Sequence, residues 1–443
     1  MAVAKRIINQ SPSFLKKAYY KVVPFEKRYG EEYVRWSRHL KKNLDFTPEQ
    51  LKQHQFWNLQ RVMASAYDNV PYYHELMVDC GLKRIIESPS DLSKLPILTK
   101  ELVIKNWGRL INRNSDPNKR ILFKTSGSTG EKFQFLGDDN LYKREAAFVN
   151  RAFYLHNSEL YGAHTVWVRR YAPQIGDPFA QVDYELNRTY LSPFNLSADT
   201  IEEYVKEIDK TKAKTLVTYP SLANFMATLM KEKDMYFKYV NAVHCASEMI
   251  LPEWRENVYK SIGIKLYAHY GMMEKVSFFC NVLGTDKYAE NLEYGYTEIV
   301  DGEVIGTGFL NDVMPLIRYT PGDQAIVDKD NTSFASLPIT VKDFIGRSTD
   351  MIETSDGRKL AGVNFYTMMY KIEGVKMFQI IQKSLTDIVV EIIPSDKYKE
   401  VHTKMKIIEG MIDRVGDCNL KVNAVKNLKR SSTGKFKTIK SEL

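Results

Sequence analysis

Cysteine is scarce in this sequence of 443 residues, and none of the cysteines is spaced as a CxxC pair. This usage argues against a disulfide framework and a zinc knuckle and favours reduced thiols. Long apolar runs are also missing, since none approaches the roughly 20 residues that a membrane-spanning helix needs. The N-terminus has no continuous apolar stretch before a small-residue cleavage site, so we expect no secretory signal. Together these absences predict a cytoplasmic protein. The cysteines are Cys80, Cys245, Cys280 and Cys418.

Two familiar nucleotide-binding motifs are absent. No G-x-G-x-x-G follows an expected strand, which disfavours a dinucleotide-binding fold, and no Walker A loop ends in G-K-S or G-K-T. The common signatures of nucleic-acid-binding modules are missing as well. We therefore interpret the formal net charge of +9 as favouring solubility and small anionic ligands, and we expect no nucleic-acid partner.

The N-terminal segment from Ser11 to Tyr29 interleaves basic with aromatic residues. Lysine and arginine next to phenylalanine and tyrosine can rest on an anionic membrane surface. Such a segment more often packs on its own domain. A peripheral contact with a membrane surface and a purely structural role therefore both stay open for this segment.

The chain is too long for one ordinary hydrophobic core, which predicts two or more domains. Short apolar segments alternate with helical patterns between Ile121 and Tyr267, which predicts a layered α/β domain. The expected strands are Ile121–Lys124, Thr165–Val168, Thr215–Thr218, Ala242–Cys245 and Lys265–Tyr267, and the expected helices are Pro48–Asp68, Ala198–Thr211 and Ser221–Lys233.

After about Ala289 the pattern changes to short strands separated by Asp-Gly and Gly-Asp turns, which indicates antiparallel pairing. A smaller α+β unit follows Asp350. The expected antiparallel strands are Tyr294–Val300, Glu303–Phe309 and Gln324–Val327, and the small unit has strands near Val375–Ile381 and Ile388–Ile393 and a helix near Tyr398–Val415.

A loop rich in hydroxyl groups and glycine follows the first of these strands. The segment Thr125-Ser126-Gly127-Ser128-Thr129-Gly130 carries four hydroxyls and two glycines. Glycine lets backbone amides approach a phosphate chain, and hydroxyls can donate further hydrogen bonds to its oxygens. By itself the segment is as consistent with a polar hairpin or linker as with a phosphate-binding loop.

Four further short motifs follow in order. Tyr270 and Glu274 lie directly after an expected strand, where α/β folds place ligands, and a carboxylate there can hold Mg²⁺ that bridges phosphates. Asp323 can accept both hydroxyls of a ribose, although its Pro-Gly-Asp context alone usually marks a turn. Arg347 could reach a ribose or form a salt bridge, and Lys435 lies on a basic tail that alone would be a solvated charge run. The motifs are Tyr270-Gly271-Met272-Met273-Glu274, Arg318-Tyr319-Thr320-Pro321-Gly322-Asp323, Gly346-Arg347-Ser348-Thr349-Asp350 and Ser432-Thr433-Gly434-Lys435.

Taken together, the five motifs resemble those of the adenylate-forming superfamily of acyl-CoA synthetases, luciferases and peptide-synthetase adenylation domains. The chain is more closely similar to the phenylacetate–CoA ligase-like branch, often called CapK, whose members tend to accompany capsule and O-antigen biosynthesis. The resemblance covers nearly the whole chain. The branch features are Asn69-Val70-Pro71-Tyr72-Tyr73, Leu95-Pro96-Ile97-Leu98-Thr99-Lys100, Tyr219-Pro220-Ser221 and the segment Gly306–Tyr319.

This resemblance implies a fold and a mechanism. A large layered α/β domain with a small β-barrel-like part, residues 1–348, would adenylate a carboxylic acid with ATP and Mg²⁺. A small mobile α+β domain, residues 349–443, would carry the catalytic lysine and rotate about a hinge at Thr349 and Asp350. Relatives often have Asp or Lys where this chain has Thr349. A thiol, such as that of coenzyme A, or an amine would then attack the acyl-adenylate.

The resemblance also implies roles for individual residues. Lys435 would bridge the carboxylate and the α-phosphate, and Glu274 would serve Mg²⁺. Ala246 to Glu248 would line the adenine slot, Tyr270 would cover the base, and Asp323 and Arg347 would hold the ribose. The implied ATP-binding residues are Thr125, Ser126, Gly127, Ser128, Thr129, Gly130, Ala246, Ser247, Glu248, Tyr270, Gly271, Met272, Asp323 and Arg347.

The substrate is less determined than the chemistry. The acid could be small and aromatic, an amino acid, or a uronic acid in a glycan precursor. Arg169 and Arg170 could meet a second carboxylate or a sugar phosphate, or form a surface pair. Some relatives carry Cys and His ligands after the magnesium glutamate, but no histidine lies between Cys280 and Tyr294, so we expect no structural zinc. The expected acyl pocket comprises Trp167, Arg169, Arg170, Tyr171, Tyr219, His244 and Met272.

Two other functions stay open at this point. A nucleotidyl transferase would deliver AMP itself to a small-molecule acceptor, and its product would retain AMP. A non-catalytic relative would bind ATP without activating an acid. The persistence of all five motifs favours an enzyme.

Overall fold

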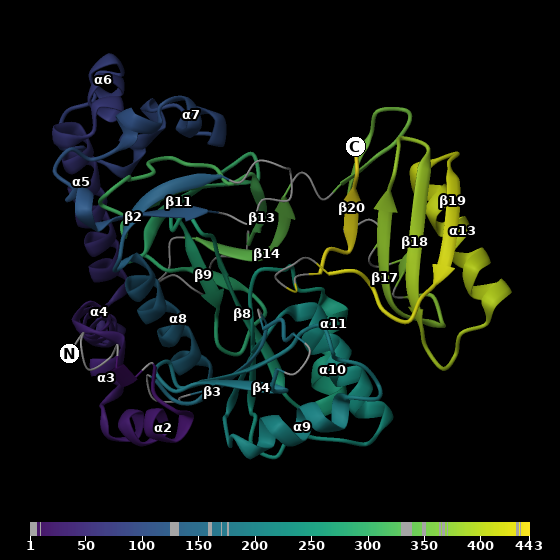
Figure 1. The fold of residues 1–443 in the computed structure, drawn as a ribbon. Coiled ribbons are helices and arrows are strands. Elements are labelled where there is room, and N and C mark those ends of the chain that lie inside the picture. The colour runs from purple at the N-terminus through teal and green to yellow at the C-terminus, as the bar shows by residue number, and fades with distance from the viewer. Residues whose placement is uncertain are drawn as a thin grey trace.

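The computed structural model describes the chain outside residues 1–6, 9, 125–132, 158–161, 170, 175–176, 329–338, 348–350, 363–364, 366–367, 370, 431–433 and 435. Helices of the first 110 residues gather along one flank of a large sheet (Figure 1). Helix α5 begins where the sequence predicts it, because Thr47 and Gln50 cap its first turn reciprocally and Pro48 suits that turn. These helices are α2 (Ser13–Val22), α3 (Phe25–Tyr29), α4 (Glu31–Lys42), α5 (Pro48–Asn69), α6 (Pro71–Asp79) and α7 (Lys100–Lys105).

The middle of the chain alternates strands with helices, as its sequence pattern predicts. All five strands expected here are present, and the last of them extends beyond Tyr267 to Gly271. The helices are α8 (Leu141–Asn157), α9 (Ile201–Lys210), α10 (Pro220–Glu232) and α11 (Pro252–Ile262). The strands are β1 (Arg120–Lys124), β2 (Gln134–Asp138), β3 (Thr165–Val168), β4 (Ala180–Asp183), β5 (Arg188–Leu191), β6 (Thr215–Thr218), β7 (Ala242–Cys245) and β8 (Lys265–Gly271).

Most of the strands belong to one sheet of 12 strands, in the order β11-β12-β13-β14-β10-β9-β8-β7-β6-β3-β5-β4. Strands β5, β3, β6, β7 and β8 are parallel, and from β8 onward the pairing is antiparallel. Strand β8 therefore joins the two parts of the sheet. The antiparallel strands are β9 (Phe278–Asn281), β10 (Tyr288–Glu290), β11 (Gly295–Val300), β12 (Glu303–Gly308), β13 (Asp323–Val327) and β14 (Thr340–Arg347).

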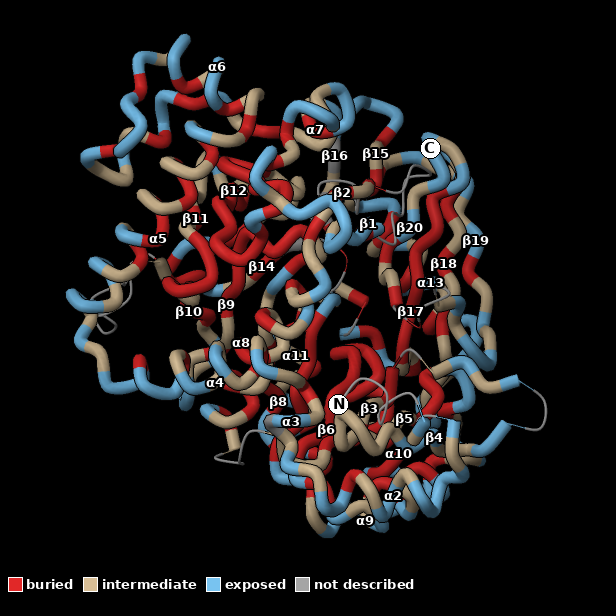
Figure 2. The backbone as a smooth tube through the Cα atoms, turned by 60° about the vertical axis from the view of Figure 1, so that its left-hand side comes forward, coloured by how far each residue is buried: buried red, intermediate tan, exposed pale blue. Residues whose placement is uncertain are grey.

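Buried apolar residues fill both sides of this sheet (Figure 2). One cluster includes Val166, Leu216 and Val243 from neighbouring parallel strands. A second cluster, which includes Phe148 of α8 and Phe278 of β9, lies on the side of the N-terminal helices. Burying these faces supplies the main driving force for folding, since it removes apolar surface from water. Among the described residues, no helix is both long and apolar enough to cross a bilayer.

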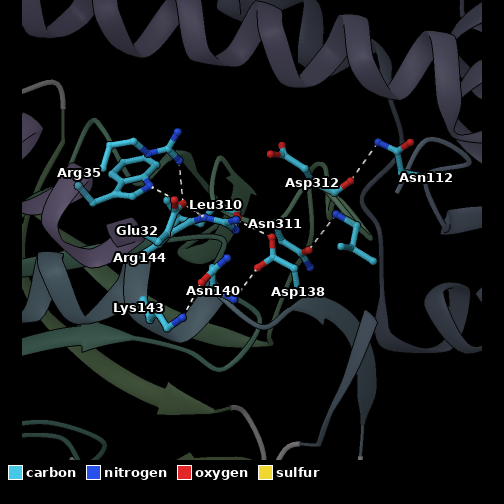
Figure 3. Close-up of polar contacts among 12 residues, drawn as sticks. Glu32, Arg35, Asn112, Asp138, Asn140, Lys143, Arg144, Leu310, Asn311 and Asp312 are labelled. Carbon is cyan, nitrogen blue, oxygen red and sulfur yellow. Dashed lines mark hydrogen bonds and ion pairs between the residues drawn. The ribbon is translucent and has the colours of Figure 1, made fainter. Parts of the chain in front are cut away.

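A buried arginine connects three distant segments of the large unit (Figure 3). Arg144 of α8 donates to the carboxylate of Glu32 in α4 at 2.8 Å and to the carbonyl of Leu310 at 2.6 Å. Its guanidinium also pairs with Asp138 at the end of β2. A fork of donors shared among three acceptors resists displacement of any one of them. The β1–β2 hairpin is therefore fixed against α8.

The C-terminal unit has its own sheet and core. Its four-stranded sheet has the order β19-β18-β17-β20, and a two-stranded hairpin, β15 with β16, lies beside it. The α/β fold with a smaller α+β unit, predicted from the sequence, is confirmed. The boundary expected between residues 348 and 349 lies outside the described residues and stays a prediction. The elements are β15 (Met351–Glu353), β16 (Lys359–Ala361), β17 (Val375–Gln382), β18 (Asp387–Pro394), α13 (Glu400–Val415), β19 (Asn419–Ala424) and β20 (Ile439–Ser441).

Candidate active site

The carboxyl ends of four parallel strands meet at one edge of the large sheet. The register pairs Val168 with Thr218, Thr218 with Cys245, and Cys245 with Ala268. The chain therefore leaves all four strands in one row, and side chains at equivalent positions point to the same face. Open α/β sheets bind their ligands at this edge. The residues that follow in that row, named the edge row below, are Arg169, Tyr219, Ala246 and His269.

Of the residues expected to form the acyl pocket, Trp167, Arg169, Tyr219 and His244 lie at or just before this edge, while Met272 is buried in the cluster on the side of the N-terminal helices. Their role in binding an acid stays a prediction. The buried guanidinium of Arg169 lies 4.8 Å from the ring centroid of Tyr219 and 5.6 Å from that of Trp167. His244 lies in the row just before, which also contains Trp167, with Val217 of β6 between them. Tyr171 is different, because its hydroxyl donates to the carbonyl of Pro178 in its own loop. Arg170 lies outside the described residues.

The residues expected to hold the base and ribose lie on β8, β13 and β14, of which only β13 and β14 are adjacent in the sheet. The hydroxyl of Tyr270 donates to the carboxylate of Asp323 at 2.9 Å. The ring of Tyr270 stacks on Phe344 with centroids 3.8 Å apart. Asp323 pairs in register with Arg347, of which only the backbone is described. The ring of Tyr270 is thus held by stacking on Phe344, and its hydroxyl is held by the carboxylate of Asp323.

Glu274 lies close to the stem of the hydroxyl- and glycine-rich loop. Its carboxylate is buried, at 4% exposure of the residue, and accepts a hydrogen bond from the Tyr319 hydroxyl at 3.3 Å. The ring of Tyr319 in turn stacks on Phe133, the first described residue after the loop. The stem ends at Lys124, which pairs with Gln134 across the hairpin. Glu274, which was expected to bind Mg²⁺, and the stem of the loop that was expected to bind phosphates therefore lie close to each other.

Glycines determine how closely the antiparallel strands approach this glutamate. A Cβ atom on Gly308 would lie 2.4 Å from the carbonyl oxygen of Lys275, and one on Gly295 would lie 2.3 Å from that of Val276. Real Cβ atoms do not tolerate such distances, so only glycine permits strands β11 and β12 to pack on the backbone that follows Glu274. Two glycines of the branch motif, Gly306 and Gly308, thus have a structural explanation.

The segment Ala246-Ser247-Glu248 links the edge row to the C-terminal unit. Ser247 has a left-handed backbone, with φ of 74°, and its hydroxyl accepts from Arg169 at 3.3 Å. Glu248 accepts from the backbone N–H groups of Ser221 at 3.1 Å and Phe436 at 2.6 Å. Burial raises the pKa of the Glu248 carboxyl, while the nearby Arg430 opposes that rise.

The residues on either side of Lys435 lie at this edge. A Cβ atom on Gly434 would come within 2.6 Å of the Pro193 side chain and 3.5 Å of the Tyr219 ring, and Phe436 bonds to Glu248. Lys435 itself lies outside the described residues, as do Thr125, Ser126, Gly127, Ser128, Thr129, Gly130, Thr349 and Asp350. Their roles stay predictions.

Sequence reasoning missed two histidines of the site. His156 of α8 and His269 of β8 lie on either side of His244 and form hydrogen bonds to it. The only sequence signal was that His269 stands two residues after Tyr267 on the same face of its strand. The sequence analysis did not predict helix α8, so it could not place His156 against the sheet.

Comparisons with known proteins agree with this geometry. Residues 352–442 match the CapK C-terminal domain family. Over 413 residues the chain is 22% identical to protein CapK of Staphylococcus aureus, covering 88% of each chain. The fold is similar to that of 2-hydroxyisobutyryl-CoA ligase in its postadenylation state, with 14% identity, a TM-score of 0.67, and coverage of 88% of this chain and 89% of that one.

The expected resemblance to the adenylate-forming superfamily and its CapK branch is confirmed. The same 2-hydroxyisobutyryl-CoA ligase in its thioesterification state matches less well, with 14% identity, a TM-score of 0.54, and coverage of 88% of this chain and 90% of that one.

No group of three or more His, Cys, Asp or Glu side chains within the described ranges is arranged to hold a metal ion. The chemistry of Glu274 nevertheless fits Mg²⁺, which is bound in nucleotide sites through one or two carboxylates together with substrate phosphates. A buried carboxylate next to the stem of a phosphate-type loop meets that requirement.

Proposed function

We propose that this protein is an ATP-dependent ligase that activates a carboxylic acid as an acyl-adenylate. The observation that carries the proposal is the hydrogen bond from Phe436 to Glu248, which brings the neighbours of Lys435 to the carboxyl edge of the parallel strands. Tyr270 with Asp323 and Glu274 with Tyr319 lie along the same edge. In this proposal the nucleotide, its metal ion and Lys435 meet at that edge.

The proposed reaction joins two anions. A carboxylate oxygen attacks the α-phosphorus of ATP, a new oxygen–phosphorus bond forms, and the bond to pyrophosphate breaks. Lys435 would neutralise charge between the carboxylate and the α-phosphate, and Glu274 would hold Mg²⁺, which would supply further charge neutralisation. Tyr270 and Asp323 align the nucleotide, which lowers the entropic cost of bringing the reactants together. The protein itself contributes no nucleophile.

The second half-reaction transfers the acyl group to an acceptor. A thiol or an amine attacks the acyl carbon, and AMP leaves with the electrons of the broken carbon–oxygen bond. Coenzyme A is our proposed thiol, because similar folds were solved with coenzyme A and an acyl-adenylate bound. A sugar amine or another amino compound is the alternative acceptor. We also propose a place in surface-polysaccharide biosynthesis, which rests on the similarity to CapK.

The experiment is an ATP–pyrophosphate exchange screen over small aromatic acids, hydroxy acids, amino acids and uronic acids, with mass spectrometry of the products. Exchange that depends on one acid, with release of free AMP after an acceptor is added, is the expected result. A product that retains AMP would show a nucleotidyl transferase instead. Failure to bind ATP would leave only a non-catalytic role.

Glu274 gives the screen a specific check. We expect Glu274→Gln to lower exchange by about 100-fold or more, because the amide cannot replace the charge that binds Mg²⁺. Glu49→Gln on the exposed face of α5 is the matched control and should exchange normally. Unchanged exchange in Glu274→Gln would remove this carboxylate from the site.

Membrane contact through the N-terminal segment and a cytoplasmic location belong to the same proposal. Phe14 and Val22 of α2 are 68% and 81% exposed, beside the exposed Lys17 and Lys21. An apolar stripe between lysines suits the surface of an anionic membrane. A peripheral location would bring the enzyme to membrane-bound glycan precursors.

A further inference from the structure

Three histidines are connected by hydrogen bonds in a chain that ends at His269 of the edge row. Nε2 of His156 lies 3.0 Å from the carbonyl oxygen of Asn281, and Nδ1 of His156 lies 3.3 Å from Nδ1 of His244. Nε2 of His244 lies 2.9 Å from Nδ1 of His269. The chain thus begins at a backbone carbonyl and ends at Nε2 of His269.

The starting carbonyl determines where every proton lies. A carbonyl only accepts, so Nε2 of His156 must donate, and a neutral His156 then accepts at Nδ1. His244 must therefore donate from Nδ1 and accept at Nε2. His269 must in turn donate from Nδ1, which leaves its Nε2 as a lone-pair acceptor.

Burial keeps all three rings neutral, as this assignment requires. It lowers the pKa of His156 to about 4 and that of His269 to about 3. The pKa of His244 also lies well below its usual value, first because of burial and then because of the neighbouring His269 and His156. Near neutral pH none of the three rings therefore carries a second proton, which could reverse the donor and acceptor roles along the hydrogen-bonded chain.

The acceptor end of the chain faces the candidate site. His269 belongs to the edge row and is half-buried, and among the described residues none forms a hydrogen bond to its Nε2. Gly271 follows on the same face of β8 and is exposed. A Cβ atom on Gly271 would lie 3.2 Å from the ring of Phe278 and 4.0 Å from Cδ2 of His269, so glycine adds no side chain next to this ring.

We propose that the acid activated here carries a hydroxyl group that donates a hydrogen bond to Nε2 of His269. This inference rests on the proposed ligase function. An ammonium group could also donate, but the buried guanidinium of Arg169 in the same row would repel a second positive charge. A methoxyl group cannot donate at all. The site therefore selects hydroxy acids, including hydroxyl-rich uronic acids, over amino acids and acids without a hydroxyl.

The first test reads the protons directly and needs no substrate. In ¹⁵N-histidine-labelled protein, long-range ¹H–¹⁵N spectra should show His156 protonated at Nε2, and His244 and His269 protonated at Nδ1. Phenylalanine variants at each position assign the signals. A His269 protonated at Nε2 would overturn the proposal, because its acceptor would then point to His244 and not to the site.

The second test compares acids that differ in one group. Mandelate, phenylacetate, O-methylmandelate and phenylglycine form one series, and lactate, propanoate and alanine form a smaller one, with glucuronate as a hydroxyl-rich acid. In ATP–pyrophosphate exchange, at least one hydroxy acid should exceed its matched analogues by roughly 10-fold in kcat/KM, the effect of one hydrogen bond in a closed pocket. Equal use of hydroxylated and unhydroxylated acids would overturn the proposal.

Variants connect that preference to one nitrogen atom. His269→Phe keeps an aromatic ring but removes the acceptor, so kcat/KM for the hydroxy acid should fall to the value for its analogue without a hydroxyl group. His269→Gln can present an amide oxygen and should restore part of the preference. His164→Phe is the control, because His164 contacts Asn187 and Thr189 away from the site. If His269→Phe lowers kcat/KM equally for all the acids, His269 has only a structural role.

The two proposals can fail separately. If no acid supports exchange, the ligase function is contradicted, while a shift of the His269 Nε2 signal on titration with a hydroxy acid still tests recognition. A shift that the unhydroxylated analogue does not cause would support the proposal. The same shift from both acids, or none from either, would overturn it.

Discussion

At the scale of single residues, the proposed nucleotide site includes a contact between side chains that are 53 positions apart, Tyr270 and Asp323. The phenol donates to the carboxylate and orients it, and stacking on Phe344 holds the ring in place. A carboxylate that is oriented in advance loses little freedom when it accepts two ribose hydroxyls. Recognition of the nucleotide should therefore be sensitive to Asp323 and less sensitive to the phenol.

We expect Asp323→Ala to weaken ATP binding by roughly 1–3 kcal/mol, because a charge-assisted contact to the ribose is lost. Tyr270→Phe keeps the aromatic ring and the carboxylate and should cost less than about 1 kcal/mol. Calorimetric titration with ATP measures both variants, and thermal melting shows whether each still unfolds cooperatively. Equal losses of binding and stability in Asp323→Ala would mean that Asp323 only forms the turn.

At the scale of secondary-structure elements, close backbone packing holds the segment after Glu274. Strand β12 approaches the carbonyls of Lys275 and Val276 so closely that only glycine fits at Gly306 and Gly308. The position of Glu274 is thus linked to the packing of β12 against the connection between β8 and β9.

Gly308→Ala tests this link. The added methyl group would lie 2.4 Å from the Lys275 carbonyl, so we expect a loss of roughly 1–3 kcal/mol of stability through overpacking. ATP–pyrophosphate exchange should fall as well, because the backbone next to Glu274 must move. Gly108→Ala is the control, since a Cβ atom there meets nothing within 4 Å. Denaturant unfolding measures stability, and a neutral Gly308→Ala would contradict the packing argument.

A buried carboxyl on strand β10 makes a second prediction at this scale. Burial raises the pKa of Glu290 from 4.5 to about 8, against the opposing hydrogen bonds from Thr297 and Gln55. The folded protein therefore keeps a proton that the unfolded chain releases above pH 4.5. Stability contributed by this proton is complete below pH 4.5 and is lost as the pH rises through about 8.

Glu290→Gln removes this titration and keeps an oxygen that can accept from Gln55 and Thr297. The variant should gain stability relative to the wild type as the pH rises from 5 to 8, by about 2–4 kcal/mol in total. Melting temperatures at several pH values measure the difference, with exposed Glu49→Gln as the control. A difference that does not change with pH would show that Glu290 is ionised in the folded protein.

At the scale of the whole molecule, the C-terminal unit packs on α10 and α11. Lys376 of β17 pairs with Glu232 of α10 at 2.6 Å, and Phe436 donates to Glu248. Trp254 of α11 belongs to the hydrophobic core of the C-terminal unit. Together these contacts hold the C-terminal unit against α10 and α11.

We expect Lys435→Ala to cripple formation of the acyl-adenylate and to spare the use of an acyl-adenylate that is supplied ready-made. The physical reason is that a rotated C-terminal unit would carry Lys435 away from the α-phosphate for the second step. Pre-steady-state turnover of synthetic acyl-adenylate, compared with full turnover from ATP, separates the two steps.

Lys437→Ala and Lys440→Ala are internal controls for the same basic tail and should be tolerated. If Lys435→Ala slows both steps equally, or neither step, the mechanism based on domain rotation is wrong for this chain. The tail would then be a solvated charged surface.

Local sequence patterns were enough to predict many of the strands and helices and to recognise the chemical motifs. Periodicity, the cap at Thr47 and Pro48, and Asp-Gly turns act within a few residues, so these elements could be located without the fold. The motifs at Tyr270, Glu274 and Asp323 could be recognised for the same reason, since each is short and continuous.

Contacts between side chains that are far apart in the sequence could be seen only in the folded structure. The edge row of Arg169, Tyr219 and His269 depends on the register of parallel strands, and pairing between segments that are far apart has no local signal. The chain from His156 through His244 to His269 also needs a helix that the sequence pattern did not reveal. The contact between Glu248 and Phe436 depends on how two units pack, which is set by surface fit between residues 188 positions apart. The motifs could therefore be recognised from the sequence, whereas the contacts between distant side chains arise from the packed fold.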